Sequence, residues 1–175
     1  MSWYKSFKVP VNKAIEARFE EAAMRLQKKL LAIDVEKLEV SAYSKKYFKD
    51  YQHKLKYSLQ ACSFILMHAL YKSNKNIEDI TLVDYGAGTG VLAMLAKEVG
   101  FGKVIYNDIY DISCKDAETI ANKAFVQADN YVCGDANALE DHFKMSHQYC
   151  DIIVSRNVIE HIYNLELYFK SLSNI

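Results

Sequence analysis

The stretch that decides the fold is LVDYGAGTG, residues 82–90. An apolar run ends in Asp84, three glycines then alternate with small residues, and a helical pattern begins at Val91. This order predicts a β-strand, a tight turn and the N-terminus of a helix in one unit. Because the turn carries little side-chain bulk, its backbone can approach a ligand closely. A carboxylate at the end of the strand favours a cationic or hydroxyl-rich ligand over a phosphate.

The composition is that of one globular domain. The chain has 175 residues, of which 51% are hydrophobic, and its 22 Lys and Arg balance its 22 Asp and Glu. A neutral chain without a basic block does not have the field of a non-specific nucleic-acid binder. No apolar run approaches the length of a membrane span, and the N-terminus does not resemble a signal peptide. We therefore expect a cytoplasmic protein without a nucleic-acid or membrane partner.

The four cysteines are widely spaced and never form a C-x-x-C pair. Three of them lie inside apolar stretches, which indicates buried, reduced thiols in a cytosol. We expect neither a disulfide nor a metal site from Cys62, Cys114, Cys133 and Cys150.

Apolar residues at helical spacing predict two helices before the glycine turn, over 13–32 and about 44–72. From residue 80 onward, apolar strands alternate with helices. Strands are expected at 80–84, 103–108, 131–133 and 151–155, and helices at 90–99, 114–126, 137–143 and 164–173. Ser113 and Asp116 resemble a capping box at the start of the helix over 114–126. The alternation predicts an α/β fold, a Rossmann-like, doubly wound parallel sheet with right-handed crossovers.

The alternation stops after four strands, although doubly wound sheets usually contain more. The apolar strand over 151–155 would then be an uncovered edge, where another chain can pair. We expect either a fragment of a longer protein or a second chain, identical or different, along this edge. The expected organisation is a single domain over 1–175, with an N-terminal helical cap over 1–75 and a Rossmann-like core over 76–175.

Two classes of ligand use a glycine turn of this kind. The dinucleotide fingerprint G-x-G-x-x-G holds a pyrophosphate at the helix N-terminus. Gly86 and Gly88 match it, but the third position is Val91, and Gly90 comes one residue early. Asp84 just before the turn also repels a pyrophosphate. An NAD(P)-dependent oxidoreductase is therefore the weaker alternative.

The pattern D-x-G-x-G-x-G resembles the first motif of the class I S-adenosylmethionine (SAM)-dependent methyltransferases, and the resemblance extends over residues 80 to about 170. The second strand ends at Asp108, where that family has an acidic residue that holds both ribose hydroxyls. Residues 134–136 (GDA) resemble the segment that meets adenine. Residues 151–162 (DIIVSRNVIEHI) resemble the D-x-I-x-x-x-x-V-L-E-H-I stretch of small-molecule methyltransferases. The resemblance implies the strand order 3-2-1-4, with the C-terminal strands of the family missing.

The resemblance also implies a cofactor, SAM, which leaves as S-adenosylhomocysteine. Asp84 would act on the ammonium group of SAM, the glycines would give its amino-acid tail room, Asp108 would hold the ribose, and Ile109 would pack near the adenine. In other interpretations, Asp84 only stabilises the helix N-terminus and Asp135 only caps the helix after it. The cofactor-binding residues implied are Asp84, Tyr85, Gly86, Ala87, Gly88, Gly90, Asp108, Ile109, Gly134, Asp135, Ala136 and Asn157.

The methyl acceptor is expected to be a small molecule, and the residues do not identify it. His161 and Glu160 are the candidate catalytic residues, because a base is needed where the acceptor must lose a proton. A packing His and a solvated Glu are the alternatives. The tyrosines at 43, 47 and 51 form either an acceptor pocket or a core seam. A non-catalytic SAM-fold subunit or fragment that needs a partner is an alternative to the enzyme.

Overall fold

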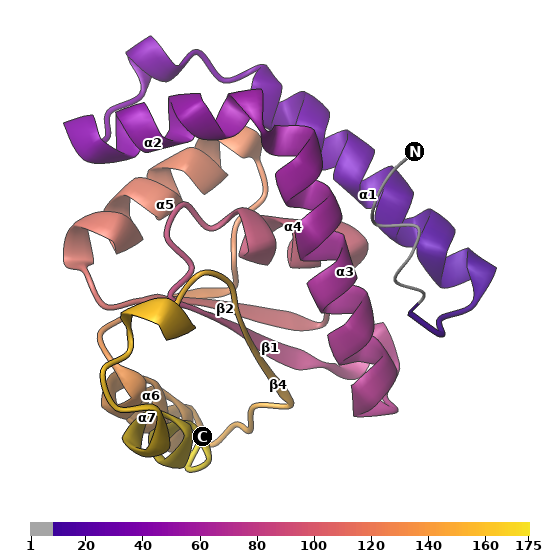
Figure 1. Ribbon diagram of the computed structural model, residues 1–175, viewed down its shortest axis with the longest axis vertical. Helices are drawn as coiled ribbons and strands as arrows, with labels where there is room; N and C mark the ends of the chain where they lie inside the picture. The colour runs from indigo at the N-terminus through magenta and orange to yellow at the C-terminus, as the bar shows by residue number, and fades with distance from the viewer. Residues whose placement is uncertain (1–8) are drawn as a thin grey trace.

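The computed structural model describes residues 9–175, which form a four-stranded parallel sheet covered by helices (Figure 1). The strand order is β3-β2-β1-β4, so the predicted order 3-2-1-4 is confirmed. All three strand pairings are parallel. The strands are β1 (Thr81–Tyr85), β2 (Lys103–Asp108), β3 (Asn130–Cys133) and β4 (Ile152–Ser155).

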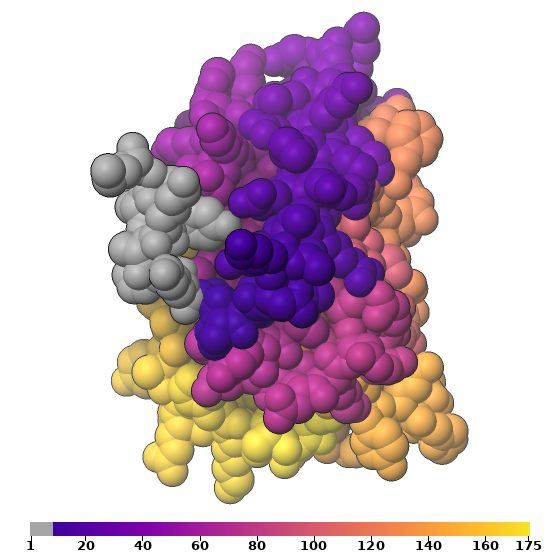
Figure 2. Space-filling view, turned by 90° about the vertical axis from the view of Figure 1, so that its right-hand side faces the viewer, coloured from indigo at the N-terminus to yellow at the C-terminus, as the bar shows by residue number. Residues whose placement is uncertain are grey.

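Helices cover both faces of the sheet, as in a doubly wound fold. Leu82 and Val104 point to the face covered by α1, α3, α4 and α5, and the residues next to them, Val83 and Ile105, point to the face of α6. Figure 2 looks onto α1, whose indigo surface occupies the middle of that side of the molecule.

Four helices belong to the core: α4 (Val91–Val99), α5 (Asp111–Ala124), α6 (Ala136–Ser146) and α7 (Leu165–Leu172). Three short 3-10 turns are η2 (Val35–Lys37), η3 (Ile77–Asp79) and η4 (Ile159–His161).

The N-terminal part is helical as predicted, with one correction. The first helix, α1 (Lys13–Leu31), is close to the expected bounds. The expected long helix is instead two helices, α2 (Ala42–His53) and α3 (Leu55–Ser73). The break is at Lys54, whose φ of −109° and ψ of 10° leave the helical region. The apolar spacing continues across this residue because both helices bury a face, so the pattern did not show the change of direction visible in Figure 1.

The capping box expected at Ser113 and Asp116 is wrong. Helix α5 begins earlier, at Asp111, and no side chain caps it. The carboxylate of Asp116 is buried and accepts hydrogen bonds from the backbone N–H and the hydroxyl of Ser41. Ser41 is the N-cap of α2, so this contact fixes the start of α2 against α5. A tertiary contact of this kind leaves no local pattern in the sequence.

The strand β4 lies at the edge of the sheet and pairs with β1 alone. Ile152 and Ile153 are half-buried there. Within residues 9–175, no helix has both the length and the apolar character needed to cross a membrane.

Candidate functional site

The glycine turn joins β1 to α4 in the conformation that its residues predict. Gly86 and Gly88 have positive φ angles of 66° and 55°, which L side chains rarely adopt. A Cβ atom on Gly86 would lie 2.5 Å from Cγ2 of Val158, whereas one on Gly88 would have no atom within 4 Å. The backbone at Gly88 therefore borders open space, which a ligand can fill.

Asp84 lies at the C-terminal end of β1, with only 2% of its surface exposed. Its carboxylate accepts a hydrogen bond from the backbone N–H of Ala93, 3.0 Å away in the first turn of α4. Burial raises the pKa of Asp84 to about 7, and the charge of Asp108 acts in the same direction, while the Ala93 hydrogen bond and the charge of Arg156 oppose it. This carboxylate therefore changes its ionisation near neutral pH.

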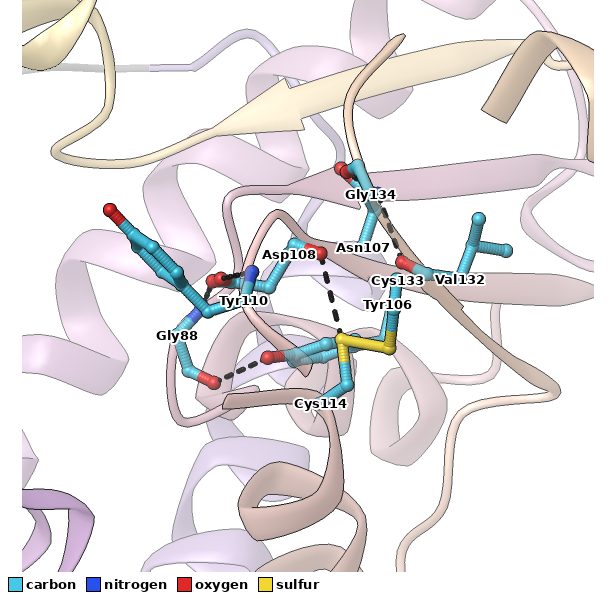
Figure 3. The surroundings of a disulfide bond; sticks show 9 residues. All are labelled: Gly88, Tyr106, Asn107, Asp108, Tyr110, Cys114, Val132, Cys133 and Gly134. Carbon is cyan, nitrogen blue, oxygen red and sulfur yellow. Dashed lines mark hydrogen bonds between the residues drawn. A yellow bond between two sulfur atoms is a disulfide. The ribbon is translucent and has the colours of Figure 1, made fainter. Parts of the chain in front are cut away.

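Asp108 is buried at the end of β2, next to the turn. One carboxylate oxygen accepts from the backbone N–H of Gly88 at 2.9 Å, and the other accepts from that of Tyr110 at 3.1 Å. The hydroxyl of Tyr106 donates to the carbonyl of Gly88 at 2.7 Å, so both sides of the turn are held by β2 (Figure 3). Each oxygen of Asp108 retains acceptor capacity for a ligand hydroxyl.

One cavity of about 890 Å³ runs along the carboxyl ends of β1, β2 and β4. Ligand pockets span roughly 300–1,000 Å³, so this volume is near the upper limit of that range. Ten of the predicted site residues line the cavity: Asp84, Tyr85, Gly86, Ala87, Gly88, Asp108, Ile109, Asn157, Glu160 and His161. The structure therefore brings the nucleoside-binding candidates and the catalytic candidates to one place.

Four predicted residues, Gly90, Gly134, Asp135 and Ala136, do not line this cavity. Gly90 is the N-cap of α4. Asp135 caps α6, accepting from the backbone N–H groups of Asn137 at 3.0 Å and Ala138 at 3.3 Å. This is the alternative considered for Asp135 from the sequence.

Comparison with known families agrees with this geometry. The model of the family described as "Methyltransferase domain" matches residues 47–175, which is most of the chain. The chain belongs to this methyltransferase family. The match is consistent with the class I SAM-dependent fold, and proteins of this class typically use SAM. Neither the curated proteins nor the solved structures gave a match.

Residues of α2 and of the segment after β4 also line the cavity. Tyr43 and Tyr47 stack with ring centroids 6.1 Å apart, and Tyr47 is 6.2 Å from Tyr51. Tyr43 is 75% exposed and Tyr47 45% exposed, so these two are not a core seam. All three tyrosines line the cavity.

The catalytic candidates Glu160 and His161 lie in η4, and both side chains are exposed. Asn157 precedes them in the left-handed region, with a φ of 57°. Val158, between Asn157 and η4, lies against Gly86 of the glycine turn, and Asn157, Glu160 and His161 all line the cavity.

The sequence analysis missed several residues that line the cavity. Asn107 lines the cavity and donates to the carbonyls of Val132 and Gly134, both at 2.9 Å, which ties β2 to the end of β3. Arg156 also lines the cavity and lies within the stretch over 151–162 that resembles the family. Its position directly after an apolar strand could have identified it as a site residue.

The expectation of four unpaired cysteines is wrong. Cys114 in α5 and Cys133 at the end of β3 form a disulfide, and Cys62 and Cys150 are free (Figure 3). The Sγ atom of Cys114 lies 3.5 Å from the carbonyl oxygen of Asp108. The two cysteines are 19 residues apart, and the packing of α5 against β3 brings them together. Within residues 9–175, no group of three or more His, Cys, Asp or Glu is placed to hold a metal ion.

Proposed function

We propose that this chain binds SAM in the cavity and transfers its methyl group to a small-molecule acceptor held between α2 and η4. In this proposal SAM becomes S-adenosylhomocysteine when it has lost its methyl group. The glycine turn and Asp84 hold the amino-acid end, Asp108 holds the ribose, and Ile109 borders the adenine. Asn157, Glu160 and His161 face the acceptor.

The observation that carries the proposal is how the N–H groups around the turn are used. In a dinucleotide site, the turn and the helix N-terminus donate free N–H groups to a pyrophosphate. Here the N–H of Gly88 donates to Asp108, and the N–H of Ala93 in α4 donates to Asp84. Because carboxylates accept from these two N–H groups, the site favours a ligand with positive charge and hydroxyls over a pyrophosphate.

The residues also fit the shape of an adenosyl sulfonium. The space beside Gly88 is open, and Asp108 has acceptor capacity left for two ribose hydroxyls. The exposed side chains of Ile109 and Tyr110 border the cavity next to Asp108 and offer apolar surface to a base. A volume of about 890 Å³ leaves room for an acceptor beside the cofactor.

SAM supplies an activated methyl group, and the acceptor's lone pair forms the new bond to carbon while the carbon–sulfur bond breaks toward sulfur. The protein contributes mainly position, since holding two reactants in line lowers the barrier by several kcal/mol. An acceptor that carries a proton at the reacting atom must lose it. In this proposal His161 or Glu160, which both line the cavity, takes that proton, or water takes it.

Thermal unfolding with SAM, S-adenosylhomocysteine, NAD and ATP tests this proposal. A ligand at one hundred times its dissociation constant adds about 2.7 kcal/mol to the free energy of unfolding. We expect only the first two ligands to raise the melting temperature. Stabilisation by NAD but not by S-adenosylhomocysteine would replace the methyltransferase with a nicotinamide enzyme.

A further inference from the structure

Arg156 brings a positive charge into a cavity that otherwise carries carboxylates. It follows β4 directly, and its side chain is half-buried. Among the described residues, no other Lys or Arg lines this cavity, whereas Asp84, Asp108 and Glu160 all do. The sulfonium and ammonium groups of the proposed nucleoside explain why the cavity has acidic residues. They do not explain why it also has the cation of Arg156.

The groups that bind the guanidinium are neutral. One nitrogen of Arg156 donates to the hydroxyl of Tyr51 at 2.9 Å and contacts Sγ of Cys62 at 3.6 Å, and the other terminal nitrogen donates to the hydroxyl of Ser58 at 3.4 Å. Burial raises the pKa of Cys62 to about 11 and also raises the pKa of Tyr51, so the thiol and the phenol stay protonated at neutral pH.

No carboxylate forms an ion pair with Arg156 among residues 9–175. Asp84 is nearby, because its register partner in β4 is Val154, two residues before Arg156. The two charges influence each other, yet they lie more than 4.0 Å apart and do not pair. A half-buried guanidinium without an ion pair is costly unless an anion reaches it.

We propose that Arg156 is the carboxylate-binding residue of the cavity, held in place by Tyr51 and Ser58. A guanidinium suits this role because it binds a carboxylate with two parallel hydrogen bonds. The carboxylate belongs either to the amino-acid end of the nucleoside or to the methyl acceptor. The first of these assignments rests on the proposed function. Asp84 lies near Arg156 and forms no ion pair within the described part of the chain, which favours the nucleoside, since one α-amino acid group offers an ammonium to Asp84 and a carboxylate to Arg156.

The first experiment compares nucleosides that differ in this group. Calorimetry measures S-adenosylhomocysteine, its decarboxylated amine and 5′-methylthioadenosine on the wild type and on Arg156→Gln. We expect Arg156→Gln to weaken the binding of S-adenosylhomocysteine roughly 10- to 100-fold, because a charged hydrogen-bonded pair is lost. The two nucleosides without a carboxylate should bind both proteins equally, which also shows that the variant is folded.

Tyr51→Phe tests the positioning role. It removes the hydroxyl that accepts from Arg156 and keeps the ring. It should therefore weaken the binding of S-adenosylhomocysteine alone, and by a smaller factor than Arg156→Gln does. A purely structural role would weaken all three nucleosides alike. The matched control is Arg25→Gln, which removes a guanidinium bound to Glu98 between α1 and α4, away from the cavity. It should leave all three affinities unchanged.

The second experiment addresses an acceptor carboxylate. The wild type and Arg156→Gln, both saturated with S-adenosylhomocysteine, are titrated with benzoate and with benzamide. Loss of benzoate binding alone in the variant assigns the carboxylate to the acceptor and supports the inference. If the variant binds S-adenosylhomocysteine and benzoate like the wild type, the inference is overturned. If the wild type binds no adenosyl nucleoside, the proposed function fails and benzoate titration of the free protein decides the inference.

Discussion

The two ends of the cavity are built in different ways. At the proposed nucleoside end, Asp84, the glycine turn and Asp108 lie within residues 84–108, and backbone N–H groups hold both carboxylates. At the proposed acceptor end, Tyr43 and Tyr47 of α2 and the segment around η4 are exposed. The hydrogen bond from Arg156 to Tyr51 joins the segment after β4 to α2, 105 residues away in the chain. The first end is buried and pre-organised, whereas the second is a surface between two separate parts of the chain.

This difference separates the residues that we expect to set affinity from those that we expect to set specificity. Pre-organised groups on strand ends hold a ligand precisely because their own partners fix them. Segments outside the regular elements tolerate changes of sequence and carry the differences between related binding sites. Changes at Asp84, Gly88 and Asp108 should therefore affect affinity for adenosyl ligands strongly, whereas changes at the exposed residues Tyr43 and Tyr47 should affect it weakly.

Filling the space beside the turn should have the largest effect. Gly88→Leu places a side chain where no atom lies within 4 Å of the Cβ position, so it occupies the ligand's volume. We expect S-adenosylhomocysteine to bind more than about 100-fold more weakly by calorimetry, a loss of roughly 2.7 kcal/mol or more. Asn74→Leu is the control, because Asn74 also has a positive φ, 53°, but lies outside the cavity. Equal loss in both variants would show that strain, not volume, matters.

Removing the ribose acceptor should be next. Asp108→Ala loses charged hydrogen bonds worth about 1.5–3 kcal/mol each, so we expect S-adenosylhomocysteine to bind roughly 10- to 100-fold more weakly. Calorimetry with 2′-deoxyadenosine and adenosine as weak probes locates the effect at the hydroxyls. An unchanged affinity would remove Asp108 from the nucleoside end.

The pKa of Asp84 predicts a smaller, pH-dependent effect. With a pKa of about 7, Asp84 is mostly protonated at pH 6 and mostly ionised at pH 8. Affinity for the ammonium of S-adenosylhomocysteine should therefore rise about tenfold between these values. Since the pKa is raised on folding, the contribution of Asp84 to stability is present below pH 4 and is lost as the pH rises through 7. Asp84→Asn should remove the pH-dependence of both the affinity and the stability. If either pH-dependence survives this substitution, another group causes it.

The smallest effect on nucleoside affinity is expected from the α2 contact. Asp116→Ala leaves the N–H of Ser41 without its acceptor, which costs about 1–3 kcal/mol of stability. Hydrogen exchange should rise at the start of α2, while the affinity for S-adenosylhomocysteine stays within about threefold. A large loss of affinity would show that α2 and the nucleoside end act as one unit.

The local patterns around the glycine turn were enough to predict which residues of β1, the turn and β2 lie together. The strand, the turn and the helix follow one another in the chain, so LVDYGAGTG and the acidic end of β2 placed Asp84, Gly88 and Asp108 correctly in one cavity. The helix break at Lys54, the Asp116–Ser41 contact and the disulfide were not predicted. Each of these joins or separates segments whose spacing in the sequence shows no local sign.

Apolar periodicity and glycine spacing were sufficient to predict the parallel α/β sheet and the carboxylates around the turn, because both patterns act between near neighbours. The strand order came from the family resemblance. Three features became visible only in the folded structure: Asp135 caps a helix, the tyrosines of α2 line the cavity, and Arg156 lines it with neutral partners. Those outcomes depend on how α2 and α3 pack against the strand ends, and packing between distant segments is set by the whole fold.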